Sequence, residues 1–77
     1  MVEVRYFAAA ADVAGKPGET LDAATVGELQ RVLTAKYGAT MARVLSVSAY
    51  LVGDQLTRDP ATPVGTRVDV LPPFAGG

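Results

Sequence analysis

A single long helix near the middle of a chain of only 77 residues is the feature that most constrains the fold. A capping box marks its start, in which Thr25 caps the amide of Glu28 and Glu28 reaches back. The helix is predicted to run to Tyr37 and to end at Gly38. Its apolar stripe consists of Val26, Leu29 and Leu33, with Val32 and Tyr37 beside them. One such helix has to bury its stripe against another layer, which here is a sheet.

Strand patterns lie on both sides of this helix. Apolar and polar residues alternate, with the period of a half-buried strand, at residues 2–7, 47–52 and 67–71. A short return strand is predicted at 19–21, after a turn. Shorter helices are predicted at 8–14 and 40–45, a hairpin turn at Gly53-Asp54 and a loop at 57–65. The order β-β-α-β-β predicts an α+β fold, with a mixed sheet that has one face covered by the main helix and one face open.

The same alternation assigns side chains to the two faces. Val2, Val4 and Tyr6 of the first strand and Val68 and Val70 of the last are predicted to point inward. An open face should be polar, yet the outward parity is predicted to carry Phe7, Tyr50 and Leu71. Two interpretations stay open: these residues pack at the rim of the sheet, or they form a docking patch.

Composition excludes several classes of function. The chain has no cysteine and no histidine, which removes disulfides, thiol nucleophiles, imidazole bases and the usual zinc ligands. Net charge is −1, and the basic residues form no run that would attract a nucleic acid. Apolar runs such as 7–11 are too short to span a bilayer. We expect one soluble cytoplasmic domain that contacts neither nucleic acid nor membrane and carries out no catalysis alone.

The last six residues form an extended spacer, Pro72-Pro73-Phe74-Ala75-Gly76-Gly77. Two prolines favour a polyproline-like path, so the segment can reach up to ~19 Å at ~3.1 Å per residue. Gly76 and Gly77 lack a Cβ and can pass a constriction in another protein. The alternative is an inert frayed end. The functional interpretation makes the carboxylate of Gly77 the reactive group.

Several motifs together resemble the MoaD/ThiS family of sulfur carriers, and within it the MoaD-like small subunit of molybdopterin synthase. They are the opening Val-Glu-Val-Arg-Tyr-Phe-Ala, Gly15 after a short alanine-rich helix, Thr25-Val26, Val64-Gly65, and the ending Leu71-Pro72-Pro73-Phe74-Ala75-Gly76-Gly77. The resemblance covers the whole chain, and the ending is its most specific part. It implies the ubiquitin-like β-grasp fold, with a domain at 1–71 and a flexible Gly-Gly tail at 72–77.

The resemblance also implies a mechanism and partners. An adenylating enzyme, MoeB-like, would use ATP to adenylate Gly77, which is then converted to a thiocarboxylate. The loaded tail, with Gly76, Ala75 and Phe74, would enter a MoaE-like large synthase subunit and give sulfur to cyclic pyranopterin monophosphate. The catalytic groups are expected on that large subunit, and the carrier itself binds no cofactor or metal.

Partner-facing apolar residues carried over by position are Phe7, Leu56 and Leu71. Two positions depart from the family pattern, which often has Asn where this chain has Gly53 and Arg where it has Ala11. The first departure affects a turn, and the second puts a polar contact to the activating enzyme in doubt.

Other functions use the same features. A sulfur carrier for thiamine or cysteine biosynthesis would load Gly77 in the same way, although thiamine carriers are usually shorter and lack the Pro72-Pro73 pair. A ubiquitin-like modifier would instead join Gly77 to a lysine of another protein. A plain interaction domain would tolerate deletion of Gly77.

Overall fold

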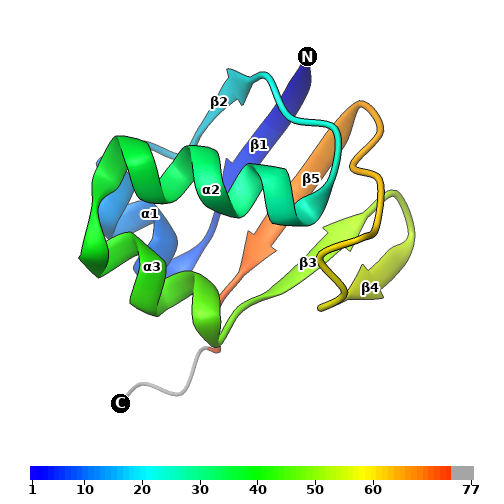
Figure 1. Ribbon diagram of the computed structural model, residues 1–77. Helices are drawn as coiled ribbons and strands as arrows, with labels where there is room; N and C mark the ends of the chain where they lie inside the picture. Colours follow the sequence, from blue (N-terminus) through cyan, green and yellow to red (C-terminus); the bar gives the residue numbers. More distant parts are fainter. Residues whose placement is uncertain (74–77) are drawn as a thin grey trace.

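Five strands form one sheet in the computed structural model, which describes residues 1–73 (Figure 1). The strands are β1 (Val2–Tyr6), β2 (Gly18–Leu21), β3 (Ala49–Val52), β4 (Gln55–Thr57) and β5 (Arg67–Leu71). The helices are α1 (Ala8–Ala14), α2 (Val26–Tyr37) and α3 (Ala39–Ser46). The α+β prediction is confirmed, together with its three helices. The short strand β4 was not predicted.

The sheet has the order β2-β1-β5-β3-β4, so the last strand lies at its centre. Strand β5 is parallel to β1 and antiparallel to β3, which confirms the mixed sheet. The β3–β4 hairpin pairs Val52 with Gln55 across the predicted Gly53-Asp54 turn. Gly53 has a φ of 62°, a value that glycine adopts without steric cost, as the first position of a type II′ turn requires. This order of strands is that of a ubiquitin-like β-grasp fold.

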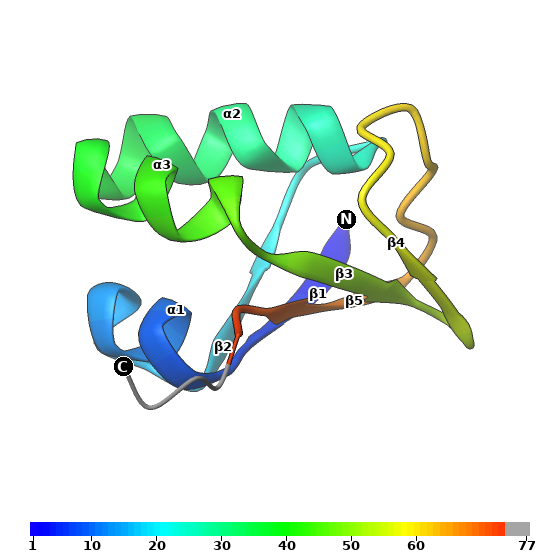
Figure 2. The ribbon, with the colours of Figure 1, turned by 90° about the horizontal axis from the view of Figure 1, so that it is seen from below.

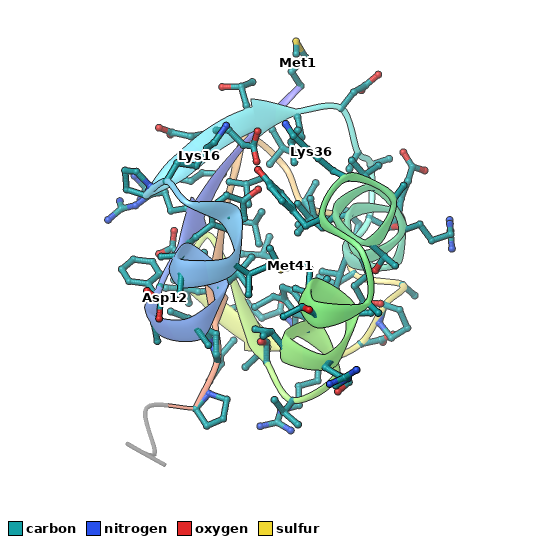
Figure 3. All side chains as sticks on the ribbon, turned by 90° about the vertical axis from the view of Figure 1, so that its left-hand side faces the viewer. Met1, Asp12, Lys16, Lys36 and Met41 are labelled. Carbon is teal, nitrogen blue, oxygen red and sulfur yellow. The ribbon has the colours of Figure 1, made fainter. Side chains whose placement is uncertain are left out.

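Helices cover only one face of the sheet. In Figure 2, α2 and α3 lie together on one side of the strands, and α1 packs against α3 near the end of β1. Met41 of α3 points into the interior between the helices (Figure 3). The buried core consists of Val2, Val4, Tyr6, Ala10, Ala23, Val26, Leu29, Leu33, Met41, Leu45, Tyr50, Val64, Val68 and Val70. The predicted inward residues of β1 and β5 are therefore all in the core. The same holds for Val26, Leu29 and Leu33 of α2, whereas Val32 and Tyr37 are half-buried.

The predicted capping box is present at the start of α2. The hydroxyl of Thr25 accepts a hydrogen bond from the amide of Glu28 at 3.1 Å. The carboxylate of Glu28 reaches back and accepts from the amide of Ala24 at 3.1 Å, one residue before the cap. The first bond satisfies an amide that a helix start otherwise leaves without a partner, and the second fixes the residue before the cap.

The loop between β4 and β5 supplies the remaining partners of this helix start. The amide of Val26 donates to the carbonyl of Thr62 at 2.9 Å, and that of Gly27 donates to the carbonyl of Pro60 at 2.8 Å. A Cβ on Gly27 would lie 3.1 Å from Cβ of Pro60, so glycine permits this close approach. The loop therefore closes over the end of the core, where Val64 is buried.

Glu19 on β2 joins the sheet to α2 through its carboxylate. It accepts hydrogen bonds from the hydroxyls of Tyr6 at 2.6 Å and Tyr37 at 2.5 Å, and from Nζ of Lys36 at 2.5 Å. Nζ of Lys16 lies 3.7 Å from the same carboxylate, and Figure 3 shows both lysines at this end of the molecule. Three elements and the α1–β2 turn thus meet at one negative charge.

Hydrogen bonding controls the ionisation of this cluster. Burial alone would raise the pKa of Glu19, but the hydrogen bonds from Lys36, Tyr37 and Tyr6 outweigh it and lower the pKa from 4.5 to about 2. Burial, followed by the hydrogen bond to Glu19, raises the pKa of the Tyr6 and Tyr37 hydroxyls. Glu19 therefore stays ionised, and both tyrosines stay protonated as donors.

One face assignment was wrong. Tyr50 was predicted on the open face, but it is 1% exposed and pairs with the inward residue Val70. Its hydroxyl accepts from Nε2 of Gln30 at 3.1 Å and donates to the carbonyl of Leu45 at 3.3 Å. A tyrosine can be buried once its hydroxyl has hydrogen-bond partners, so the ring of Tyr50 lies in the core. Its neighbours on the strand, Ala49 and Leu51, therefore face outward.

We predict that Glu19→Gln lowers the free energy of unfolding at neutral pH by about 2 kcal/mol, because it removes a charge that accepts three hydrogen bonds. The folded-state pKa lies below the unfolded one, so the contribution is complete above pH 4.5 and is lost as the pH falls toward 2. Denaturant unfolding between pH 7 and pH 2 measures it.

The control for this series is Asp12→Asn, which removes an exposed carboxylate from α1. Its unfolding curves should follow those of the wild type at every pH. Equal pH dependence in the wild type and Glu19→Gln would contradict the assigned role of Glu19.

Candidate docking face beside the C-terminal segment

The predicted reactive segment follows the central strand of the sheet. Strand β5 is held by ladders on both sides and ends at Leu71. Pro72 is buried and Pro73 is exposed. Gly77, with Gly76, Ala75 and Phe74, lies outside the described residues. The structure therefore fixes the point from which the segment starts, and Gly77 stays a prediction.

Leu56 and Leu71 lie on the open face, in two neighbouring apolar pairs. Leu56 is opposite Leu51 in the β3–β4 ladder, and Leu71 is opposite Ala49 in the β3–β5 ladder. Because residues two apart on a strand share a face, Ala49 and Leu51 join the two pairs. We call Ala49, Leu51, Leu56 and Leu71 the open-face strip. Leu56 is 63% exposed, far more than a core leucine.

Phe7 continues this surface from β1. It follows Tyr6, which pairs with Val70, just as Leu71 follows Val70 on the neighbouring strand. Phe7 is half-buried and keeps extended backbone angles at the start of α1, and the chain turns at Ala8, whose φ is 51°. The structure thus places Phe7 and Leu71 at the same end of adjacent strands, with Leu56 two strands away from Leu71.

Sequence reasoning missed Leu51 and Ala49 as members of this surface. It placed Tyr50 outward, which turned both of them inward. A usable signal was present in the hairpin, since a two-residue turn at Gly53-Asp54 sets Leu51 directly opposite Leu56. A residue opposite an outward leucine must itself face outward.

Charged side chains occupy the rest of the open face. Arg5 of β1 is the register partner of Asp69 of β5, and Nε of Arg5 lies 3.8 Å from Oδ1 of Asp69. Glu3 and Arg67 form the next pair along the same two strands. The guanidinium carbon of Arg5 is 5.6 Å from the centroid of the Phe7 ring. The open face therefore combines an apolar strip with one charged pair directly beside it.

The described surface also has an open groove on the helical side. It has a volume of about 460 Å³ and is lined by Gly27, Gln30, Arg31, Thr34, Ala35 and Pro60. These residues belong to α2 and the β4–β5 loop, on the opposite side of the sheet from the open-face strip. The groove offers no paired acid and base, and within residues 1–73 no cluster of acidic side chains is suited to hold a metal ion. No helix there is long and apolar enough to cross a membrane.

The face assignment predicts that two large residues of the β3–β4 hairpin contribute very differently to the free energy of unfolding. Tyr50→Ala should lower the free energy of unfolding by about 3–5 kcal/mol, because it empties a core site. Leu56→Ser should change it by no more than about 0.5 kcal/mol, because that side chain is exposed. Urea unfolding of both variants decides this, and a larger loss for Leu56→Ser would reverse the assignment.

Comparison with known proteins gives a relative among the solved structures. No family model and no curated protein matches the chain, so the resemblance to MoaD/ThiS carriers stays a prediction. Among solved structures, the chain is similar to the Haloferax volcanii HVO 2177 protein, determined in solution, with a TM-score of 0.70 and 30% sequence identity. The match covers 99% of this chain and 85% of that one. The chain therefore belongs to the same family of small β-grasp proteins as HVO 2177.

Proposed function

We propose that the chain is a sulfur carrier of molybdenum cofactor biosynthesis, the small subunit of a molybdopterin synthase. The observation that carries the proposal is the combination of a β-grasp domain with the sequence Leu71-Pro72-Pro73-Phe74-Ala75-Gly76-Gly77 directly after its central strand. A proline pair has no amide hydrogens to donate, so the ladder of β5 cannot continue through it. In this proposal, partner enzymes bind the domain, and the segment carries the reactive group.

The chemistry explains why the carrier needs no acid or base of its own. An α-carboxylate with a pKa near ~3.5 is ionised at neutral pH and resists attack by a nucleophile. The carboxylate of Gly77 would attack the α-phosphate of ATP and release pyrophosphate, which forms an acyl-adenylate. Hydrosulfide, delivered by the activating enzyme, would then attack the acyl carbon, displace AMP and leave a thiocarboxylate. Charge stabilisation and proton transfer fall to the partner enzymes.

The open face supplies the docking surface in this proposal. Both the MoeB-like enzyme and the MoaE-like large subunit have to bind the carrier while its segment occupies their active site. Phe7, Leu56 and Leu71 would contact them, together with Leu51 and Ala49 of the open-face strip. Because the open-face strip includes Leu71, the last residue of β5, the proposed docking surface adjoins the point from which the segment starts.

Two alternatives share the fold and the Gly-Gly ending. A carrier for thiamine or cysteine biosynthesis would form the same thiocarboxylate and give it to another acceptor. A ubiquitin-like modifier would form an isopeptide bond from Gly77 to a lysine of a target protein. The products separate these functions, because the first two pass on sulfur and the third leaves the whole chain attached.

We predict that Gly77 exchanges one carboxylate oxygen for sulfur. The chain, incubated with a MoeB-like enzyme, ATP and a sulfur donor, should gain the mass difference between the two atoms, and deletion of Gly77 should abolish the gain. Loaded protein mixed with the large subunit and cyclic pyranopterin monophosphate should then lose that mass.

The matched control is Arg43→Ala, an exposed change on α3 that keeps the segment intact and should load normally. Loading of the chain without Gly77 would refute the assignment of the reactive residue. Loading followed by no transfer to the pyranopterin would point to another acceptor, and high-mass adducts that need Gly77 would identify a modifier.

A further inference from the structure

The open face carries a charged pair beside its apolar residues. Arg5 and Asp69 face each other across β1 and β5, and Leu51 is the next residue in the same row, opposite Asp69 on β3. Phe7 lies two residues beyond Arg5, and Leu71 lies two residues beyond Asp69. A protein that covers the apolar residues therefore covers the charged pair as well.

The two charges of this pair are unequally accessible. The side chain of Arg5 is 46% exposed, whereas that of Asp69 is 15% exposed, and its Oδ1 is buried without a hydrogen bond from any described residue. The 3.8 Å separation of Nε from Oδ1 is an ion pair longer than a hydrogen bond. This contact is made by Nε of Arg5 and not by its two terminal nitrogens.

The ring of Phe7 helps to hold the guanidinium in this position. The distance of 5.6 Å between the guanidinium carbon and the ring centroid is within the range of a cation–π contact. Gly18, the neighbour of Arg5 on β2, has no side chain that would cover it from the other side. Arg5 is thus presented on the open face with its position restricted and its donors available.

Covering Arg5 with an apolar surface would leave those donors without partners, which is costly once water is excluded. Asp69 cannot satisfy them at its present distance. A carboxylate on the covering protein satisfies them well, because a guanidinium binds a carboxylate through two parallel hydrogen bonds. Such a contact, placed beside apolar residues and shielded from water by the docked protein, has the features of an energetic anchor in a protein interface.

We propose that the protein that docks on the open face presents an acidic side chain to Arg5, with apolar residues around it that fit the open-face strip and Phe7. Asp69 is less accessible to a docking protein than Arg5, since its side chain is 15% exposed and its Oδ1 is buried. The identity of the docking proteins rests on the proposed function, whereas the charge requirement comes from the geometry of Arg5.

Calorimetric titration of the chain with the purified MoeB-like enzyme and MoaE-like large subunit of the same organism tests the proposal. Arg5→Ala should weaken binding to at least one of them by about tenfold or more and should reduce the dependence of affinity on salt. Arg5→Gln, which keeps the side chain over Phe7 but removes the charge, should show the same loss. Arg43→Ala makes the same change in net charge on α3 and should bind as the wild type does.

Asp69→Asn determines the sign of the partner's charge. If an acid faces Arg5, removal of the neighbouring negative charge should leave binding unchanged or make it tighter. Weaker binding of Asp69→Asn with normal binding of Arg5→Ala would mean that a basic group is recognised, and the proposal would fall.

Wild-type affinity and salt dependence in both Arg5 variants, each with a normal melting temperature, would also overturn it. If the wild type binds neither protein, the proposal fails as well, and the mass analysis of Gly77 then shows separately whether the chain is a carrier.

Discussion

The parallel pairing of β1 with β5 is the interaction on which the rest of the structure depends. It joins the first strand to the last. The β1–β2 pair and the β3–β4 pair become one sheet only because β5 lies between them. Parallel strands need a crossover that leaves the sheet and returns, and the three helices lie within it. Since the crossover passes on one side, one face is packed and the other is left open. The location of the open face is thus a consequence of strand direction.

Polar contacts then fix the main helix at both ends. The carbonyls of Pro60 and Thr62 hold the first amides of α2, while Lys36 and Tyr37 in its last turn bind Glu19 of β2. Between these ends the apolar stripe packs on the sheet. All of these contacts lie on the helical side or at its edges. Residues on the open face therefore contribute little to the stability of the fold, so their identity is free to vary with other requirements.

Sequence reasoning predicted most of the architecture because local signals determined it. The Thr25–Glu28 capping box and the glycines at 15 and 38 gave the helix boundaries, and strict alternation gave the faces of β1 and β5. It was wrong at Tyr50, which was placed on the open face because it shares its parity with Ser48. Burial of Tyr50 depends on Gln30 and Leu45, which are brought to it only by the tertiary fold.

The candidate site was predictable to a smaller extent. Phe7 and Leu71 were correctly placed outward by parity, and Leu56 was placed by the resemblance. The membership of Leu51 depends on hairpin register, and the exposure of Arg5 over Phe7 depends on side-chain packing across strands. The hairpin register could have been inferred from the two-residue turn, whereas the packing of Arg5 over Phe7 is not encoded in a local pattern. The strand β4 was missed because three residues are too few to establish a period.

The Glu19 cluster has a consequence for chemical labelling of this protein. The chain has two lysines, Lys16 and Lys36, and both place their ammonium groups near the same carboxylate. Acylation of either amine would remove a positive charge from a group that holds β2 to α2. A fluorophore or surface tether is therefore best attached through a group other than these two lysines.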